Sequence, residues 1–494
     1  MNQISRRDIL RNSALAAATL GSSLLAQGPA AKKRPNIILV LLDDLGYGQF
    51  GPNSDMFDLN QLNPIAVERA SSGATPQVAL AQAKAAIPNI TRLVSEGTRF
   101  TDAYVACPLC APSRSAIMTG RYPQKFGIYI NEDINQAGLP REQLMLPKLL
   151  QQSGYATAAI GKWHMAKLKD GMAKEAGQHP LDRGFDYFFG FNAPGTSYYG
   201  SEILWRNREP APAKGYTTEQ FTDEAIGFIH RSKGKPFFLY LPFNAVHGPL
   251  GKPAPDRYQS RFKTGDQKLD NFYAYLNAAD EGIGRIRQVL AEQGEEKNTL
   301  IFILSDNGAP GGSPLPSNGP FLGFKGQVWQ GGLRIPMAAW GAGFVAPGKI
   351  CHEPVISMDL LPTALAAAGV ALPGPGAIDG RSLLPLLRGD KQKPHEALFW
   401  AGQLSNRWSG DKKGNRNEPA AWAVRKGRWL LRYWSHLKRF ELYDLDVDRG
   451  ERHDVLAAHP DTVKELKAEY AAWFKGLHKP LGWDEASWKA LAPA

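Results

Sequence analysis

The sequence predicts an α/β fold, with a large, mixed, mainly parallel sheet sandwiched by helices and a smaller C-terminal antiparallel sheet with one helix. The first observation is a set of four apolar runs, at residues 36–42, 155–160, 237–241 and 299–304. Uninterrupted apolar runs of this length are typical of strands buried on both faces. The second observation is that helical patterns, such as residues 146–152 and 278–293, lie between these runs. Alternation of strands and helices indicates a sheet covered by crossover helices.

A smaller C-terminal subdomain is predicted at residues 390–494, after a larger α/β domain at residues 32–389. Its strands are expected in four short aromatic-rich segments, at residues 397–401, 420–424, 428–433 and 440–442. Residues 461–477 then carry apolar side chains at helical spacing, which are Val463, Leu466, Tyr470, Trp473 and Leu477. This pattern predicts a small antiparallel sheet with one amphipathic helix.

Residues 1–31 have the pattern of a targeting segment. Arg6 and Arg7 precede a run of small apolar residues at 13–26, and the arginine pair resembles a twin-arginine export motif. The run is too short for a spanning helix with membrane flanks. We therefore expect a signal peptide read by an export machinery, a periplasmic or secreted protein, and no permanent membrane span.

Composition sets limits on partners. The chain carries 58 Lys and Arg against 47 Asp and Glu, a formal net charge of +11 that is spread along the sequence. The excess favours anionic substrates, whereas no nucleic-acid recognition module is evident and no nucleic acid is expected as a partner. Three cysteines are too few for a disulfide framework. Residues 54–87, rich in Ala, Gln and Ser, are interpreted as an insertion.

Acidic and amide side chains follow two of the predicted strands. Asp43 and Asp44 come directly after the first apolar run, and Asp306 and Asn307 follow the last one closely. In open α/β sheets, ligands bind outside the carboxyl ends of the strands. Carboxylate and amide oxygens select Ca²⁺ or Mg²⁺ rather than zinc. Helix capping is the alternative role of such residues, but two acidic strand ends favour a divalent-cation site.

Lysine and histidine follow the other two strands. Lys162 and His164 come after residues 155–160, and His247 follows residues 237–241. A lone histidine is more often structural than catalytic. The strand-end positions nevertheless make both histidines candidates for proton transfer.

The most specific pattern is the run Cys-Ala-Pro-Ser-Arg at residues 110–114, followed by Thr-Gly-Arg at residues 119–121. It resembles the signature of the type I, formylglycine-dependent sulfatases of the alkaline phosphatase superfamily. The resemblance covers the chain from Arg34 onward. In that family a maturation enzyme oxidises the cysteine to formylglycine (3-oxoalanine), whose hydrated aldehyde attacks sulfur. The resemblance implies that Cys110 is the precursor of this nucleophile.

The same resemblance implies a role for each matching residue. The implied ligands of a Ca²⁺ ion are Asp43, Asp44, Asp306, Asn307 and residue 110. Around the substrate, the resemblance implies that Lys162 and Lys325 hold the sulfate and that Arg114 favours the ionised nucleophile. It also implies that His164 is the base and His247 the general acid.

Three positions depart from the family pattern. Gln330 stands where a glutamate commonly precedes Gly-Gly, and Gln49 stands where an acid often follows Gly-Tyr-Gly. Neither is a proposed ligand, so both departures are expected to leave the metal site intact. Cys107 forms a Cys-x-x-Cys pair with Cys110, which makes a redox motif a minor alternative. Since Cys107 does not fit the signature, a small buried hydrophobic residue is the favoured interpretation.

The leading functional prediction is hydrolysis of a sulfate ester, with a sulfated carbohydrate as the favoured substrate. One alternative is a phosphomonoester or phosphodiester hydrolase of the same superfamily, which usually needs two metals and more metal-binding histidines. The other is a non-catalytic protein that binds sulfated glycans. The pocket for the leaving group is expected in loops at residues 188–208 and 402–417, where aromatic residues either stack on sugars or pack in the core.

Overall fold

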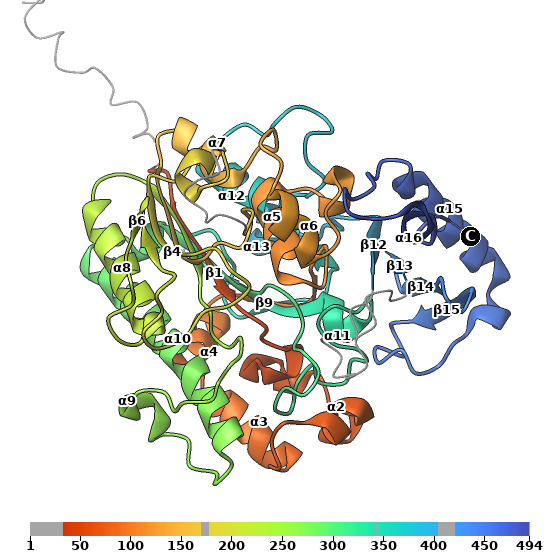
Figure 1. Ribbon diagram of the computed structural model, residues 1–494, viewed down its shortest axis with the longest axis horizontal. Helices are drawn as coiled ribbons and strands as arrows, with labels where there is room; N and C mark the ends of the chain where they lie inside the picture. Colours follow the sequence, from red (N-terminus) through yellow and green to blue (C-terminus); the bar gives the residue numbers. More distant parts are fainter. Residues whose placement is uncertain (1–32, 169–176, 342, 404–419, 494) are drawn as a thin grey trace, which may run out of the picture. The chain divides into compact units, whose positions relative to one another are not determined.

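Strand β1 (Asn36–Leu42) lies in the interior of an 11-stranded sheet, and all seven of its residues are buried. The computed structural model describes residues 33–168, 177–341, 343–403 and 420–493 (Figure 1). Alternate side chains of β1 enter two different hydrophobic cores. Ile38, Val40 and Leu42 pack into one core, and Ile37, Leu39 and Leu41 pack into the other. Because side chains of a strand point alternately to the two faces, this uninterrupted apolar run forms a strand covered on both sides.

The strand order of the large sheet is β10-β2-β9-β8-β1-β7-β3-β4-β5-β6, with β11 paired to β2. The neighbours β8, β1, β7, β3 and β4 are all parallel, whereas β9 runs antiparallel to both β8 and β2. The predicted mixed, mainly parallel sheet is confirmed. Its other strands are β2 (Thr98–Tyr104), β3 (Ala156–Lys162), β4 (Tyr187–Phe191), β5 (Trp205–Arg206), β6 (Glu209–Pro210), β7 (Phe237–Pro242), β8 (Thr299–Ser305), β9 (Arg334–Trp340), β10 (Lys349–Cys351) and β11 (Val355–Ile356).

Helices cover both faces of this sheet (Figure 1). The core on the face of Ile38 is closed by α2 (Pro64–Arg69), α3 (Pro76–Ala85), α4 (Pro88–Ser95), α8 (Thr217–Arg231), α9 (Asp256–Gln259) and α10 (Gln267–Glu292). The core on the face of Ile37 is closed by α5 (Cys110–Thr119), α6 (Asn131–Ala137), α7 (Leu146–Gln152), α12 (Leu360–Ala368) and α13 (Leu384–Arg388). A short helix, α11 (Gln330–Leu333), precedes β9.

A second, four-stranded antiparallel sheet has the order β12-β13-β14-β15, as predicted. Its strands are β12 (Ala397–Gln403), β13 (Ala420–Lys426), β14 (Trp429–Trp434) and β15 (Arg439–Asp444). One face packs against helix α15 (Pro460–Phe474), where the ring of Trp422 stacks on that of Tyr470 with centroids 3.9 Å apart. A short helix, α16 (Glu485–Lys489), accompanies α15. The other face packs on residues of the large-sheet region, such as Tyr104 and Ile356.

The interpreted insertion at residues 54–87 contains α2 and α3, whose buried alanines join the main core. Pro35–Ala494 form one compact unit, so the boundary at residues 389 and 390 stays a prediction. The predicted signal peptide and most of the loop at residues 402–417 lie outside the described residues. Within the described ranges, no helix has both the length and the apolar composition needed to cross a membrane.

Candidate active site

The predicted strand-end residues meet at one edge of the large sheet. Because β8, β1, β7 and β3 are adjacent and parallel, their carboxyl ends lie together. The side chains that follow them are Asp306, Asn307, Asp43, Asp44, His247 and His164, and Lys162 ends β3 itself. Contacts link these ends directly, since the amide of Asp44 donates to Asp306 Oδ1 at 3.2 Å. The sequence therefore predicted this convergence correctly.

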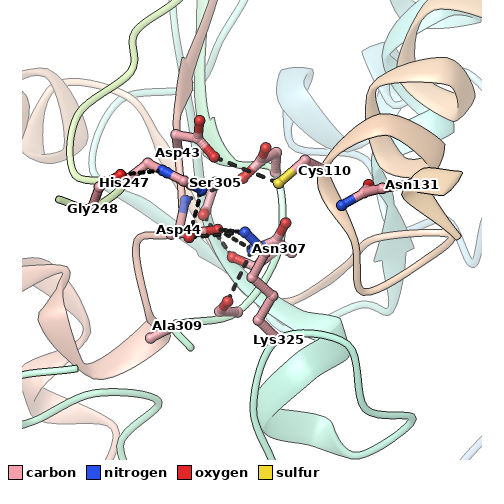
Figure 2. Close-up of polar contacts among 12 residues, drawn as sticks. Asp43, Asp44, Cys110, Asn131, His247, Gly248, Ser305, Asn307, Ala309 and Lys325 are labelled. Atoms are coloured by element: carbon pink, nitrogen blue, oxygen red, sulfur yellow. Dashed lines mark hydrogen bonds and ion pairs between the residues drawn. The ribbon is translucent and has the colours of Figure 1, made fainter. Parts of the chain in front are cut away.

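Cys110 is the first residue of α5 and points at the end of β1 (Figure 2). Its Sγ lies 3.8 Å from Asp43 Oδ1, and ligand atoms of Cys110, Asp43 and Asp44 lie within 4.8 Å of one another. Asn131 fixes the start of the helix, because its Oδ1 accepts a hydrogen bond from the amide of Ala111 at 3.0 Å. Burial raises the pKa of the Cys110 thiol to about 12. The unmodified side chain is therefore a neutral thiol near pH 7 and a poor nucleophile.

Arg114 lies one helical turn after Cys110 and is completely buried. Its guanidinium donates to Asp306 Oδ2 from two nitrogens, at 2.6 and 3.0 Å, and to the carbonyl of Lys162 at 3.1 Å. The same guanidinium lies 3.5 Å from Asp43 Oδ2. Arg114 therefore ties the ends of β8, β3 and β1 to the helix that carries Cys110.

Two buried lysines neutralise the aspartates at the end of β1. Lys162 Nζ lies 2.7 Å from Asp43 Oδ2, and Lys325 Nζ lies 2.7 and 2.9 Å from the two carboxylate oxygens of Asp44. Burial disfavours the charged form of Lys325, but Asp44 and the other nearby acids outweigh it and raise its pKa. The loop of Lys325 is joined to the loop before Cys110 by the hydrogen bond from the amide of Gly326 to the carbonyl of Pro108, at 2.8 Å.

His247 lies on the loop after β7, next to the end of β1. Its Nδ1 donates to the carbonyl of Gly248 at 2.7 Å, and its Nε2 lies 3.7 Å from Asp44 Oδ2 (Figure 2). Burial lowers the pKa of His247, and the two aspartates oppose this effect. The hydroxyl of Tyr198 holds the loop by donating to the carbonyls of Asn244 at 2.7 Å and His247 at 3.0 Å. Tyr198 is thus a buried core residue and not an aromatic platform for a sugar.

His164 follows β3 and is fully buried. Its Nε2 lies 3.3 Å from Asn135 Oδ1, and its Nδ1 is buried without a hydrogen-bond partner among the described residues. Burial lowers the pKa of His164 well below its ordinary value, and the nearby cations Lys162, Arg114 and Lys325 lower it further. His164 is therefore neutral near pH 7.

Asn307 supports a cation site at this position. Its Nδ2 donates to Asp44 Oδ1 at 2.7 Å, while its Oδ1 is buried with no hydrogen-bond donor in the described part of the chain. A buried amide oxygen without a donor is free to bind a ligand such as a metal ion. The carboxylates of Asp43 and Asp44 supply further oxygen donors of the kind that suits Ca²⁺, beside Cys110. Asp306 is paired with Arg114 and the amide of Asp44, so it would have to exchange one of these contacts to bind the ion. The residues present therefore fit a calcium ion.

The two glutamines that depart from the family pattern have structural contacts. Gln49 is buried, accepts from the amide of Gly46 at 2.9 Å and donates from Nε2 to the carbonyl of Pro314 at 2.7 Å. Gln330 Oε1 accepts from the hydroxyl of Tyr104 at 2.9 Å. Neither side chain contacts the aspartates of the cluster in the described structure, as the sequence predicted.

Sequence reasoning missed Asn131 and Asn135 as site residues, whereas it placed Tyr198 in a loop whose aromatic residues either stack on sugars or pack in the core, and the structure shows the second. The two asparagines are four residues apart on α6, which places them on one helix face. The same spacing of polar residues also occurs on solvent-exposed helices, so the pattern gave no usable signal. Cys107 was interpreted correctly as buried, and its thiol donates to the carbonyl of Tyr129 at 3.2 Å.

Comparison with known proteins identifies the family. The family model described as Sulfatase matches residues 35–370. The chain belongs to the sulfatase family. A second family model, N-sulphoglucosamine sulphohydrolase, C-terminal, matches residues 324–475 of this sulfatase.

Individual relatives agree with this assignment. The sulfatase is 39% identical to the uncharacterized sulfatase YdeN of Escherichia coli (strain K12), over 92% of this chain and 87% of that protein. It is 32% identical to N-acetylgalactosamine-6-sulfatase of Homo sapiens, over 78% of this chain and 74% of that protein. The crystal structure of Ps i-CgsB in complex with k-i-k-neocarrahexaose has a TM-score of 0.75 at 28% identity, covering 93% of this chain and 97% of that one. The protein is an enzyme that hydrolyses sulfate esters, and its family generally uses formylglycine and Ca²⁺.

Proposed function

We propose that this sulfatase removes sulfate from a carbohydrate, using a formylglycine made from Cys110 and a calcium ion held at the end of β1. Relatives support the substrate class, because one is named for a sulfated amino sugar and another was solved with a neocarrahexaose. The single observation that carries the proposed site is the convergence of Cys110 with buried acids and cations at one sheet edge.

Modification of Cys110 explains why a buried, neutral thiol occupies the centre of the site. A thiol whose pKa is raised to about 12 supplies almost no thiolate near pH 7. Formylglycine would supply a hydrated aldehyde, one hydroxyl of which attacks sulfur while the other allows sulfate to leave. The hydrogen bond from Ala111 to Asn131 and the Arg114 pair with Asp306 would hold residue 110 in place for this reaction.

The proposed ligands of the calcium ion are Asp43, Asp44, Asp306, Asn307 and residue 110. When bound, the ion would polarise the ester and favour an ionised nucleophile. Three carboxylates and three cations already balance in charge, through the contacts of Arg114, Lys162 and Lys325. A divalent cation would give the site a net positive charge, which attracts an anionic sulfate ester.

The remaining roles follow from where each side chain faces. Lys162 and Lys325 would exchange their aspartate contacts for sulfate oxygens and stabilise the charge that develops as the S–O bond breaks. Nδ1 of His247 donates to the carbonyl of Gly248, so only the protonated ring carries a hydrogen on Nε2 as well; in that form Nε2, which lies beside Asp44, would donate the proton to the leaving oxygen. The bound anion would favour this step, because a negative charge nearby raises the pKa of a histidine. His164, which is neutral, would act as the base.

The N-terminal segment supports a proposed route to the periplasm or outside the cell. Arg6 and Arg7 precede a short apolar run, as in segments read by a twin-arginine export machinery. Such a route carries folded proteins, so a maturation enzyme could modify Cys110 before export. Deletion of residues 1–31 should retain the enzyme in the cytoplasm, and cell fractionation with an activity assay tests this expectation.

The proposed chemistry is tested by mass spectrometry of the tryptic peptide that contains residue 110, together with turnover of an aryl sulfate. Active protein is expected to carry formylglycine, and Cys110→Ala is expected to be inactive. Cys107→Ala is the matched control and should keep its activity, because the polar partners found for its thiol among the described residues are backbone groups of Tyr129 and Leu109. An unmodified thiol in fully active protein would overturn the proposal. Preference for an aryl phosphate over the aryl sulfate would favour the phosphatase alternative, and a panel of sulfated mono- and oligosaccharides would identify the substrate.

A further inference from the structure

The two ring nitrogens of His164 have different surroundings. Nε2 faces the side-chain oxygen of Asn135 at 3.3 Å, and Nδ1 is buried without a partner among the described residues. A neutral imidazole has one N–H donor and one lone pair, and the partner of one nitrogen decides which form is present. The contact of Nε2 with Asn135 therefore decides which nitrogen of His164 carries the hydrogen and which one can accept a proton.

An amide oxygen only accepts hydrogen bonds, so it favours the tautomer with hydrogen on Nε2. That tautomer leaves the lone pair on Nδ1. The opposite tautomer would bury an N–H group at Nδ1 with no acceptor, which is less common in proteins than a buried acceptor without a donor. The cations that act on His164, which are Lys162, Arg114 and Lys325, also favour a lone pair over an N–H group inside the site.

Helix α6 connects Asn135 to the nucleophile as well. Asn131, one turn earlier on the same face, accepts from the amide of Ala111 next to Cys110. The carbonyl of Asn135 accepts from the amide of Leu168, so the helix is also fixed to the loop that follows His164. Figure 1 shows α6 beside α5, and Figure 2 shows Asn131 next to Cys110. One helix face thus sets the positions of both residue 110 and His164.

We propose that Asn135 is a positioning residue that holds His164 as the Nε2–H tautomer and so makes Nδ1 the proton acceptor of the reaction. This inference rests on the proposed role of His164 as base. In the step concerned, the O–H bond of the free hydroxyl on formylglycine 110 would break and an N–H bond would form at Nδ1. The electron pair left on oxygen would become the C=O bond of the aldehyde as the C–O bond to sulfate breaks, and sulfate would leave with that bonding pair. The proton leaves His164 for water before the next turnover.

The tautomer can be measured without turnover. Long-range nitrogen–proton correlation spectra of protein labelled with ¹⁵N-histidine distinguish the two tautomers, and loss of signals in His164→Gln assigns this residue. The unmodified wild-type protein is expected to show Nε2–H, and Asn135→Leu is expected to show a mixture or the opposite form. An Nδ1–H tautomer in the wild type would overturn the inference.

Kinetics of the matured enzyme provide the second test. Asn135→Leu is expected to lower kcat by about 10–100-fold, with KM changed by less than about 2-fold. Asn135→Asp keeps an acceptor and adds a negative charge, so it should retain more activity than Asn135→Leu at alkaline pH. The added charge opposes the effect of Lys162, Arg114, Lys325 and His247, which lower the pKa of His164, and so raises that pKa. Since the base must be neutral, activity should then fall at a higher pH than in the wild type as the solution is acidified.

A purely structural role for Asn135 predicts a different result. Both variants would then lose stability and activity together, and the pH at which kcat falls would not move in Asn135→Asp. Gln136→Ala, on the exposed side of the same helix, is the matched control and should behave as the wild type. An unchanged pH profile in a folded Asn135→Asp protein would overturn the inference. Failure of the sulfatase proposal would instead appear as an inactive wild type, with the tautomer measurement still valid.

Discussion

At the scale of single residues, the site is a charge-balanced cluster in the protein interior. Arg114, Lys162 and Lys325 pair with three aspartates, and all six side chains are at most 5% exposed. Burial of ions carries a desolvation cost that pairing offsets only when geometry is good. Such a cluster is weak evidence for stability, and its buried charges fit a site that binds an ion and an anion.

Removal of calcium should abolish activity without unfolding the protein. Chelation with EGTA is expected to eliminate turnover of an aryl sulfate, while circular dichroism stays unchanged because Lys162 and Lys325 still neutralise Asp43 and Asp44. Added Ca²⁺ should restore the activity of the wild type. Asp44→Asn should not be rescued by the same addition, since it lacks one proposed ligand charge. Full activity of a metal-free sample would contradict the proposed role of the ion.

Gln49 should not tolerate the acid that is common at this position in the family. In Gln49→Glu, a carboxylate would face the carbonyl of Pro314, to which the glutamine amide now donates. The variant is expected to lose about 1–3 kcal/mol of unfolding free energy near pH 7. Burial beside a carbonyl raises the pKa of the new carboxyl in the folded state, so the loss should grow as pH rises above the ordinary value for glutamate. Urea unfolding at pH 5 and pH 8 measures this, and equal stability at both pH values would contradict it.

At the scale of elements, strand β14 supports the loop that carries Lys325. Arg432 on β14 donates to the carbonyl of Val328 at 2.7 Å and pairs with the buried Glu451. Glu451 in turn accepts from the amide of Gln330 at 2.8 Å. The small sheet therefore holds the segment between Lys325 and α11 through one buried ion pair.

Arg432→Met should destabilise the protein more than the double change Arg432→Met with Glu451→Gln. The single variant leaves Glu451 buried without its ion-pair partner, which is expected to cost about 3–5 kcal/mol. The double variant removes both charges, so its loss should be clearly smaller. Equilibrium urea denaturation of the three proteins tests this order. Equal losses in both variants would show that the ion pair is not the cause.

The sequence predicted elements well where the hydrophobic pattern has one dominant period. β1 and α7 have the predicted bounds, 36–42 and 146–152. Helix α10 begins at Gln267, whereas the sequence predicted its start at residue 278. The prediction began too late because residues 272–276 are all buried and show no amphipathic periodicity. The strand-end site residues were predictable since parallel strands end at one edge. Asn135 was not, because its role depends on tertiary contact with His164.

At the scale of the whole molecule, the two sheets share a hydrophobic core and a buried ion pair. Trp400 of β12 is completely buried and donates to the carbonyl of Val105 at 2.7 Å. Asp102 of β2 receives two hydrogen bonds of 2.7 Å from Arg425 of β13 and lies 3.2 Å from Arg334 of β9. Because both contacts cross from one sheet to the other, we expect the sheets to unfold together in a single transition.

Asp102 should make the stability of the interface between the two sheets sensitive to acid. Burial alone would raise its pKa, but Arg334 and Arg425 outweigh it and hold the pKa of Asp102 below its ordinary value of 3.8. The charged form therefore stabilises the fold fully above that value, and the contribution is lost as pH falls below it.

In Asp102→Asn, two buried arginines lose their carboxylate, and the unfolding free energy at pH 7 should fall by about 3 kcal/mol. The difference in unfolding free energy between variant and wild type should narrow as the pH is lowered below about 4, because the Asp102 carboxyl of the unfolded wild type then takes up a proton while the folded one is still charged. Urea unfolding followed by tryptophan fluorescence from pH 7 to pH 3 measures both effects. Asp446→Asn, whose side chain is 67% exposed and 3.9 Å from its arginine partner, is the control and should change stability by less than about 0.5 kcal/mol. If the difference in unfolding free energy between Asp102→Asn and the wild type stays constant across this pH range, the carboxylate of Asp102 does not couple the two sheets.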